Sequence, residues 1–493
     1  MFKVCIIGAG FSGICAAVRL KTELGNICHV TIFDENHDFG GVWLKNTYPG
    51  CACEVPSHLY CFSWEPNPEW TQAYCSQNEI LAYLQNISKK YGLYQSAKFN
   101  HFVHKIQWDE KSLNWKVIVE DKKSVLFNKT EELNFDIIIH AQGRFASPQI
   151  PAEYANFEGS VLHTAQWDEE VKVEGKNVLV VGCGASGAQV IPKLGVMSNF
   201  LVVYQRHAPW VMPRTNFYFP SWIKWMFASV PLIHRAYRTL LHWIFERNIS
   251  GFRIGSIANR LAPLLSKFHL WRQVKNPKIR KQLTPNYNFG CKRIVNSNEY
   301  YRTFNLANVI LIDNKILVEK NGILTESGHH YDIDVIVLAT GFQVQNLFGQ
   351  ISVIGKNGID IPQLWMNDKP MTYLSIMSSA GPNLFVLLGP NASTGYTSII
   401  IQLETQVEWV IKVIRELNSN KKKTICVKGA AEQKYMKHLE RKLKKTVYGS
   451  SQCGKCNSWY LNPKGDVVEI YPDSTLAYKK ETLSIVPSDF EFC

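Results

Sequence analysis

The chain opens with FKVCIIGAGFSG, residues 2–13, in which a short apolar strand runs into a glycine-rich turn. A helical pattern follows over residues 14–24, and a second strand over residues 29–33 ends at Asp34. In such a unit the first glycine makes the turn, the second lets the backbone approach a pyrophosphate, and the third lets helix and strand pack closely. The free N–H groups at the start of the helix attract phosphate. The sequence therefore predicts a dinucleotide site at Gly8, Gly10, Ser12 and Gly13.

The same pattern returns in the middle of the chain. An apolar strand over residues 177–181 leads into GCGASG, residues 182–187, then into a helix and a strand over residues 201–205 that ends at Arg206. A glycine-rich turn alone is weak evidence, because such turns are common, but here both lie between a strand and a helix. We predict a second dinucleotide site at Gly182, Gly184, Ser186 and Gly187.

The charged residue that ends each second strand predicts which dinucleotide binds. Asp34 lies 21 residues beyond Gly13, close to the spacing expected for an acid that binds a ribose hydroxyl and repels an extra phosphate. Arg206 lies 19 residues beyond Gly187, where a guanidinium would pair with a 2′-phosphate. We therefore expect FAD at the first site and NADPH at the second.

Composition places the chain among globular proteins. It has 493 residues, of which 46% are hydrophobic and 19% charged, and this length suggests two or three domains. The net charge of +13 favours an anionic partner without choosing among nucleic acid, acidic lipid and phosphorylated cofactors. The strand at residues 2–7 leaves no room for a signal peptide, so we expect an intracellular, cytoplasmic protein whose 13 cysteines are reduced.

Two further strands, over residues 136–140 and 334–338, end in glycine turns and indicate that the chain leaves and re-enters each sheet. We predict an α/β fold with two discontinuous Rossmann-like domains and a helical insertion. The predicted limits are residues 1–150 and 343–493 for an FAD-binding domain, 151–214 and 284–342 for an NADP-binding domain, and 215–283 for the insertion. The insertion is rich in aromatic and basic residues, and charges interrupt it too often for a membrane-spanning helix.

With these motifs in view, the chain resembles the class B flavoprotein monooxygenases and, within them, the Baeyer–Villiger monooxygenases. Residues 157–168, FEGSVLHTAQWD, match the signature of the latter group, in which Phe, Gly, His and Trp are followed by Pro or Asp. The sister group, which oxygenates amines and sulfides, carries an aromatic-basic pair where Trp167 and Asp168 stand. In the family this segment is a hinge between cofactor domains, so His163 is not expected to carry proton chemistry.

The resemblance covers nearly the whole chain and implies further contacts with the cofactors. GGVW at residues 40–43 matches a flavin-binding turn, CEVPSHLY at 53–60 lies beside the flavin ring in relatives, and GCKR at 290–293 matches the family's Lys-Arg pair. Relatives usually carry Asp where Glu54 stands, and the extra methylene could shift its partner by about an ångström. The additional cofactor contacts implied are Gly41, Trp43, Tyr60, Val103, Lys292 and Trp459.

The resemblance also implies the reaction. NADPH reduces the flavin, dioxygen adds to it as a peroxide, and attack on a ketone or aldehyde gives an ester or lactone. The peroxide must stay anionic, which requires a fixed cation, and arginine is suited because it keeps its proton. Arg293 is the expected cation, and Glu54 is expected to orient it through a bidentate ion pair. Lys292 is expected to help Arg206 hold the 2′-phosphate.

Several alternatives stand beside this interpretation. One is oxygenation of sulfur or nitrogen on the same fold, and another is an NADPH:flavin redox or regulatory protein that does not oxygenate. Cys453 and Cys456 form a Cys-x-x-Cys, but they precede Ser458-Trp459-Tyr460 rather than a cofactor turn, so disulfide reduction is not expected. Neither a metal site nor a nucleic-acid-binding module is predicted. The aromatic and basic insertion suits a lipid interface, so peripheral membrane contact stays an alternative; no oligomeric state is predicted.

Overall fold

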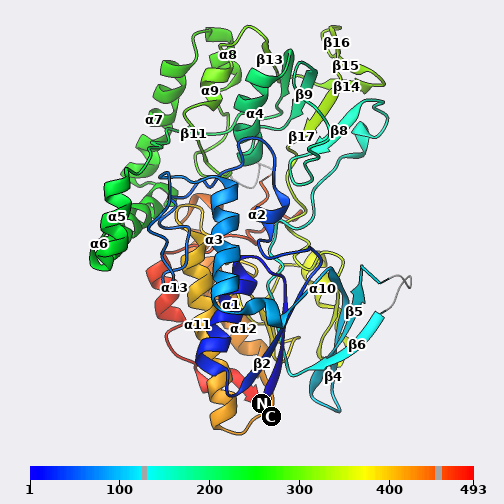
Figure 1. Ribbon diagram of the computed structural model, residues 1–493, viewed down its shortest axis with the longest axis vertical. Helices are drawn as coiled ribbons and strands as arrows, with labels where there is room; N and C mark the ends of the chain where they lie inside the picture. The colour runs from blue at the N-terminus through cyan, green and yellow to red at the C-terminus, as the bar shows by residue number, and fades with distance from the viewer. Residues whose placement is uncertain (125–129, 450–457) are drawn as a thin grey trace.

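Two parallel sheets, one in each half of the molecule, carry the two glycine-rich turns (Figure 1). The computed structural model describes residues 1–124, 130–449 and 458–493. The first sheet has the strand order β19-β7-β1-β2-β3 and the second has the order β13-β10-β9-β17-β8. Every neighbouring pair in both sheets is parallel. The predicted α/β class with two Rossmann-like sheets is confirmed.

The first sheet reverses its winding beside β1 (Phe2–Ile7), which lies between β2 (Cys28–Asp34) and β7 (Ile137–His140). Open α/β sheets bind ligands at the carboxyl ends of the strands where such a reversal occurs. Helix α1 (Phe11–Leu24) begins three residues earlier than its sequence pattern predicts, because Gly10 in extended conformation forms its N-cap inside the glycine turn. The remaining elements of this layer are β3 (Ala97–Phe99), β19 (Leu384–Val386) and α11 (Ile399–Ser419), which packs on α1.

The second sheet repeats this arrangement. Its central strand β9 (Asn177–Val181) lies between β10 (Phe200–Tyr204) and β17 (Val335–Leu338), and helix α4 (Ala185–Met197) follows the glycine turn. The edge strands are β13 (Val309–Ile312) and β8 (Ser160–His163). The family signature at residues 157–168 therefore includes an edge strand of this sheet.

Smaller elements cover the two sheets. A mixed sheet on the right of Figure 1 contains β18 (Ser352–Ile354), β4 (His101–Asp109), β5 (Asn114–Asp121) and β6 (Thr130–Phe135). An antiparallel sheet beside β17 contains β14 (Ile316–Glu319), β15 (Gly322–Thr325) and β16 (His330–Asp332). The other helices of the lower half are α2 (Val42–Lys45), α3 (Gln77–Lys90), α10 (Ile361–Asn367), α12 (Gly429–Leu443) and α13 (Thr475–Glu481).

The segment predicted as a helical insertion is helical. It contains α5 (Ser221–Ser229), α6 (Pro231–Glu246), the 3-10 helix η3 (Arg247–Phe252), α7 (Ile257–Gln273) and α8 (Pro277–Gln282). Among the residues that the structure describes, no helix has the length and apolar character needed to cross a membrane. The domain limits given above stay a prediction.

The expectation that all cysteines are reduced thiols is wrong for Cys291. Ten cysteines of the described chain are free, whereas Cys291 is disulfide-bonded. Composition cannot predict such a bond, because it depends on two sulfur atoms meeting at a fixed distance and angle. The Cys-x-x-Cys pair, Cys453 and Cys456, lies outside the described residues.

A buried histidine pair joins the lower half to the helical segment. Nδ1 of His58 and Nε2 of His234, on α6, lie 2.8 Å apart and share a hydrogen bond, and the two residues are 1% and 3% exposed. Burial, with the neighbouring charges, lowers the pKa of His58 to about 3 and that of His234 to about 4. Both rings are therefore neutral in the folded protein over a range in which the unfolded chain binds protons.

We expect this pair to make the fold sensitive to mild acid. Below an unfolded pKa near 6.5 the unfolded state gains two protons that the folded state excludes, so stability falls as pH falls, by about 2.7 kcal/mol per pH unit until pH approaches 4. His234→Gln keeps a donor and an acceptor but does not titrate, so it should remove about half of that slope. Urea unfolding of both proteins at pH 7 and pH 5 measures the difference, and equal losses in the two proteins would contradict the assignment.

Candidate active site

The first glycine turn is built from backbone contacts that exclude side chains. Gly8 has φ +113°, and a Cβ on it would lie 2.5 Å from the carbonyl oxygen of Ala141, just after β7. A Cβ on Gly13 would lie 1.8 Å from the carbonyl oxygen of Gly8. Gly41, with φ +56°, approaches Gly10 so closely that a Cβ on it would lie 2.8 Å from the Cα of Gly10. The glycine turn at residues 8–13 and the turn at residues 40–43 therefore meet here, and their backbones are in direct contact without side chains between them.

Asp34 lies at the end of β2 beside this turn. Its Oδ2 accepts a hydrogen bond from the N–H of Ala9 at 2.6 Å, and its Oδ1 accepts one from the N–H of Asn36 at 2.8 Å. Burial raises the pKa of this carboxyl, although these hydrogen bonds partly offset the rise. A carboxylate fixed at this place has further lone pairs for a ribose hydroxyl.

The second glycine turn repeats the same contacts. A Cβ on Gly182, which has φ +101°, would lie 2.5 Å from the carbonyl oxygen of Ala339, after β17. A Cβ on Gly187 would lie 2.3 Å from the carbonyl oxygen of Gly182. Gly184, in contrast, has no protein atom within 4 Å of an added Cβ. The middle of this turn is open, as a pyrophosphate would require.

Arg206 and Lys292 stand near this second turn, although they are far apart in the sequence. Arg206 is exposed and follows β10. Burial lowers the pKa of the neighbouring His207, and the positive charges of Lys292 and Arg206 lower it further. Burial raises the pKa of Cys183, inside the glycine turn, and the same two cations partly offset that rise. The two predicted phosphate ligands are thus brought together.

Arg293 and Glu54 form the ion pair that the sequence predicts. Nε and Nη2 of Arg293 both donate to Oε2 of Glu54, at 3.0 and 2.9 Å. Both donors converge on Oε2, whereas Oε1 is buried without a hydrogen-bond partner in the described chain. The Glu54 side chain is 6% exposed and that of Arg293 is 43% exposed, so a buried carboxylate holds a cation that still faces outward.

Arg293 stays protonated. Burial lowers its pKa, but the nearby Glu54, Tyr460 and Cys53 outweigh this effect and raise it above the ordinary value of arginine. Burial also raises the pKa of Tyr460 to about 12, with Arg293 opposing the rise, so its hydroxyl keeps its proton. The sequence marks Tyr460 only as part of the Ser458-Trp459-Tyr460 motif and does not predict its electrostatic effect on Arg293.

The other predicted contacts are spread over both halves of the molecule. Trp43 and Tyr60 are near each other, with ring centroids 5.6 Å apart, and Phe11 of α1 lies 5.0 Å from Tyr60. Val103 lies on β4 within a buried cluster that includes Phe33 of β2. The ring centroid of Trp459 lies 5.8 Å from that of Phe145 and 4.5 Å from that of Tyr460. Ser12 is buried in the first turn of α1, and Ser186 lies in the first turn of α4.

A cavity of about 400 Å³ lies between the two halves and reaches Glu54. Residues 47–52 form one wall, and α4 with residues 295–299 forms the opposite wall. Gln189 of α4 joins the walls: its Oε1 accepts from the hydroxyl of Tyr48 at 2.8 Å, and its Nε2 donates to the carbonyl of Ala52 at 3.0 Å. Nothing in the sequence sets Gln189 apart from other helix residues, so its bridging role was missed.

His163 is not placed for proton chemistry. Its Nδ1 accepts a hydrogen bond from the N–H of Ala165 at 3.0 Å, and burial lowers its pKa. The ring therefore stays neutral and stabilises the turn after β8, as expected. No group of metal-ligating side chains occurs in the described part of the chain.

These residues fit two dinucleotides. Each turn offers backbone N–H groups at the start of a helix, and Asp34 at one turn and Arg206 at the other match a ribose hydroxyl and a phosphate. Oε1 of Glu54, which lies at the cavity, has no partner within the described residues and is available to a bound group. Buried polar atoms are rarely left without a partner in a loaded site.

Known proteins resemble this chain over its whole length. The model of the FMO-like family, described as flavin-binding monooxygenase-like, matches residues 1–472. A Baeyer-Villiger monooxygenase of Pseudomonas aeruginosa is 33% identical over 484 residues, which cover 97% of this chain and 89% of the relative. One of Streptomyces coelicolor is 31% identical over 494 residues, covering 99% and 92%.

Solved structures agree with the sequence comparison. The cyclohexanone monooxygenase from Rhodococcus sp. Phi1 bound to NADP+ has a TM-score of 0.86 and 26% identity, and the match covers 100% of this chain and 99% of that one. A steroid monooxygenase bound to NADP has a TM-score of 0.84 at 26% identity and the same coverage. The prediction of a flavoprotein monooxygenase with relatives of the Baeyer–Villiger type is confirmed, and the chain belongs to the flavin-binding monooxygenase-like family.

Proposed function

We propose that this protein is an FAD-dependent, NADPH-consuming Baeyer–Villiger monooxygenase that inserts one oxygen atom from dioxygen into a ketone or aldehyde and releases an ester or lactone. The observation that carries the proposal is Arg293, a permanent cation that faces outward while two of its N–H groups are held on buried Glu54. The relatives named as Baeyer-Villiger monooxygenases, at 31–33% identity, support the same reaction.

FAD fits the first turn and NADPH the second. Gly8, Gly10 and Gly13 hold the diphosphate of FAD, Asp34 its ribose, and Gly41 closes the same cradle. Gly182, Gly184 and Gly187 hold the diphosphate of NADPH, and Arg206 with Lys292 binds its 2′-phosphate. When bound, the reduced flavin supplies the electrons that activate dioxygen. One solved relative is described as a complex with FAD and NADP and another as bound to NADP+, which supports this pair of cofactors.

Arg293 stabilises the negative charge on the oxygen atom that is transferred. It also stabilises the charge that develops on the substrate's carbonyl oxygen when the carbonyl carbon is attacked. Its raised pKa ensures that it donates hydrogen bonds and does not surrender a proton. Glu54 fixes its orientation through two hydrogen bonds to Oε2. Lys292, the preceding residue, acts at the NADP turn, so one short segment serves both sites.

Arg206→Ala is expected to raise the KM for NADPH by about ten- to a hundredfold, because charge-assisted hydrogen bonds to the 2′-phosphate contribute about 1.5–3 kcal/mol. The KM for NADH, which lacks that phosphate, should not change. Steady-state kinetics with both cofactors measures the two values, and Arg441→Ala, an exposed arginine on α12, is the matched control. An equal rise for NADH and NADPH would contradict a phosphate-binding role.

Glu54→Asp tests whether the longer side chain of Glu54 lowers the rate of ester formation. The structure shows normal hydrogen-bond lengths from Glu54 to Arg293, so the geometry already accommodates the extra methylene. We therefore expect the shorter side chain to lower the rate of ester formation, by about tenfold, since withdrawing the carboxylate by about an ångström releases Arg293. A higher rate, measured by gas chromatography of the product, would instead show that Glu54 impairs the site.

The substrate class is tested by offering the FAD-loaded protein, with NADPH and dioxygen, a cyclic ketone, a thioether and a tertiary amine in parallel. We expect a lactone from the ketone with a higher kcat/KM than any sulfoxide or N-oxide. A preference for the thioether or the amine would overturn the ketone assignment and favour oxygenation of sulfur or nitrogen.

A further inference from the structure

The positive charge of the chain is concentrated in the helical segment. Residues 215–283 contain twelve Lys or Arg and a single acidic residue, Glu246, so they carry nearly all of the net charge of +13. Glu246 is 5% exposed and points inward. The outer surface of this segment therefore presents basic side chains with no carboxylate among them.

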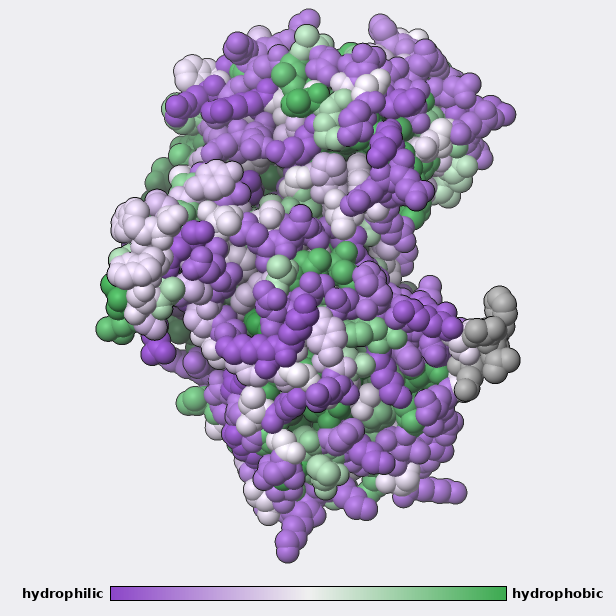
Figure 2. Space-filling view, in the orientation of Figure 1, coloured by the Kyte–Doolittle hydropathy of each residue, from purple (hydrophilic) through white to green (hydrophobic). Residues whose placement is uncertain are grey.

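The same helices turn apolar side chains outward. On α7 the exposed apolar residues recur at helical spacing along one face: Ile257, Leu261, Leu264, Leu265, Phe268 and Trp271. On α6 another such face carries Leu232, Ile233, Leu240, Trp243 and Ile244. These side chains are 40–77% exposed, which reverses the usual orientation of an amphipathic helix at a protein surface. Figure 2 shows pale and green side chains gathered along the left edge, over α5 and α6.

Exposed tryptophans are concentrated on these helices. The exposed tryptophans of the described chain are Trp222 and Trp225 on α5, Trp243 on α6 and Trp271 on α7, and they are 51–68% exposed. Tryptophan prefers the boundary between acyl chains and headgroups, where its ring is apolar and its N–H can bind water. Exposed basic residues stand among them, including Arg260, Lys267 and Arg272.

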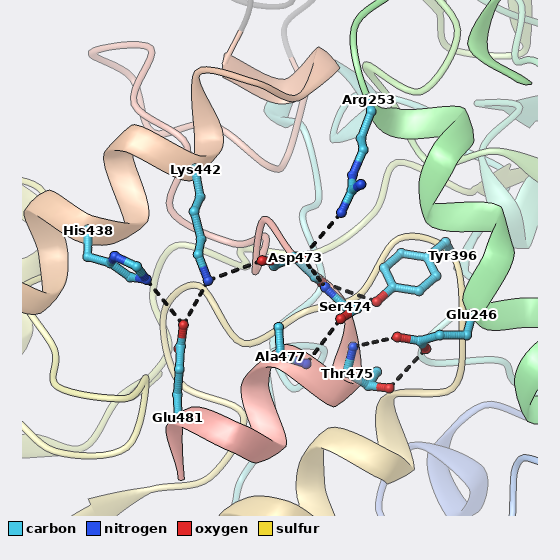
Figure 3. Close-up of polar contacts among 10 residues, drawn as sticks. All are labelled: Glu246, Arg253, Tyr396, His438, Lys442, Asp473, Ser474, Thr475, Ala477 and Glu481. Atoms are coloured by element: carbon cyan, nitrogen blue, oxygen red, sulfur yellow. Dashed lines mark hydrogen bonds and ion pairs between the residues drawn. The ribbon is translucent and has the colours of Figure 1, made fainter. Parts of the chain in front are cut away.

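The opposite side of the segment is anchored to the protein. Glu246 accepts hydrogen bonds from the N–H and the hydroxyl of Thr475, at 2.7 and 2.9 Å, at the start of α13 (Figure 3). Arg253 pairs with Asp473 at 3.4 Å, and Asp473 also pairs with Lys442 at 3.1 Å. These contacts hold the end of α6 and the end of η3 on the C-terminal helices, so the apolar face is presented outward on a fixed support.

We propose that the outer face of α5, α6 and α7, called here the helical face, binds the surface of a membrane that contains anionic lipid. The apolar side chains enter the boundary between headgroups and acyl chains, and the basic residues contact the lipid phosphates. Charge selects this occupant: a second copy of the chain would bring another basic surface to the same face, which is repulsive, whereas an anionic bilayer is complementary. The inference does not depend on the oxygenation reaction.

Vesicle binding of the FAD-loaded full-length protein tests the proposal. Protein is sedimented with vesicles of phosphatidylcholine alone and with vesicles that also contain phosphatidylglycerol. We expect binding to the mixed vesicles to be at least about tenfold tighter, to weaken as salt is raised, and to bring exposed tryptophans into reach of brominated acyl chains, which quench their fluorescence. Absence of binding to the mixed vesicles would overturn the proposal.

Variants show whether vesicle binding depends on the helical face or only on the overall charge of the protein. Trp222→Ser with Trp225→Ser, and Arg260→Glu with Lys267→Glu, should each weaken binding by about tenfold or more. Leu317→Ser, which changes an exposed apolar residue on β14, outside the helical segment, should leave binding unchanged. Unchanged FAD absorbance and thermal midpoint confirm that each variant is folded. Equal binding by all the variants would overturn the proposal, as would a lipid-free dimer in sedimentation velocity that the double tryptophan variant abolishes.

Discussion

Arg293→Ala is expected to lower the rate of ester formation by about a hundredfold to a thousandfold while NADPH is still oxidised. In other enzymes, removing one preorganised donor from the place where negative charge develops lowers the rate by about this factor. The electrons delivered by NADPH should then leave as hydrogen peroxide instead of reaching the substrate. The measurement is the ratio of ester to hydrogen peroxide per NADPH consumed.

A loss of activity on its own would not distinguish chemistry from folding, because Arg293→Ala leaves the buried carboxylate of Glu54 without its partner. Arg293→Ala combined with Glu54→Gln removes that buried charge as well. We expect the double variant to regain the stability of the parent in urea unfolding but not its ester formation. Unchanged ester formation in the single variant would show that another group stabilises the transferred oxygen.

Gly13→Ala is expected to destabilise the protein by about 3 kcal/mol and to abolish FAD binding. The added Cβ would lie 1.8 Å from the carbonyl oxygen of Gly8, and both atoms belong to backbone fixed between β1 and α1. Either the helix moves away from the sheet or the turn opens, and both changes disrupt the surface that holds the diphosphate. Urea unfolding gives the stability, and the absorbance of the purified protein gives the flavin content.

Gly184→Ala is the matched control in the second turn. Its Cβ meets no protein atom within 4 Å, and its φ is negative, so folding stability should not fall. The methyl group would instead occupy the space left for the pyrophosphate of NADPH and raise the KM for NADPH. If Gly13→Ala kept full flavin and parental stability, the first turn would not be the close-packed cradle described here.

The glycine turns could be predicted from the sequence because their geometry is local. Gly13 and Gly187 are required by backbone contacts within a strand–turn–helix unit, and the residues after the returning strands β7 and β17, Ala141 and Ala339, lie against Gly8 and Gly182. The charges that end β2 and β10 were also predictable, because their spacing follows from the length of one helix and one strand.

Features that depend on the approach of distant segments could not be predicted. The placement of Tyr460 beside Arg293, the bridge made by Gln189, and the convergence of two N–H groups on one oxygen of Glu54 all arise where the two halves meet. The outward orientation of the helical face could not be predicted from the sequence either. The spacing of Leu261, Leu265 and Phe268 predicts an apolar stripe on a helix, but only the fold shows that this stripe faces outward.

The most direct test of the central claim follows the oxygen atom. The FAD-loaded protein is given NADPH, a cyclic ketone and dioxygen labelled with the heavy isotope of oxygen, and both lactone and hydrogen peroxide are measured against NADPH consumed. We expect nearly one lactone per NADPH, with one labelled oxygen in each lactone. Stoichiometric hydrogen peroxide without labelled product, from ketones, thioethers and amines alike, would contradict it and identify an NADPH oxidase.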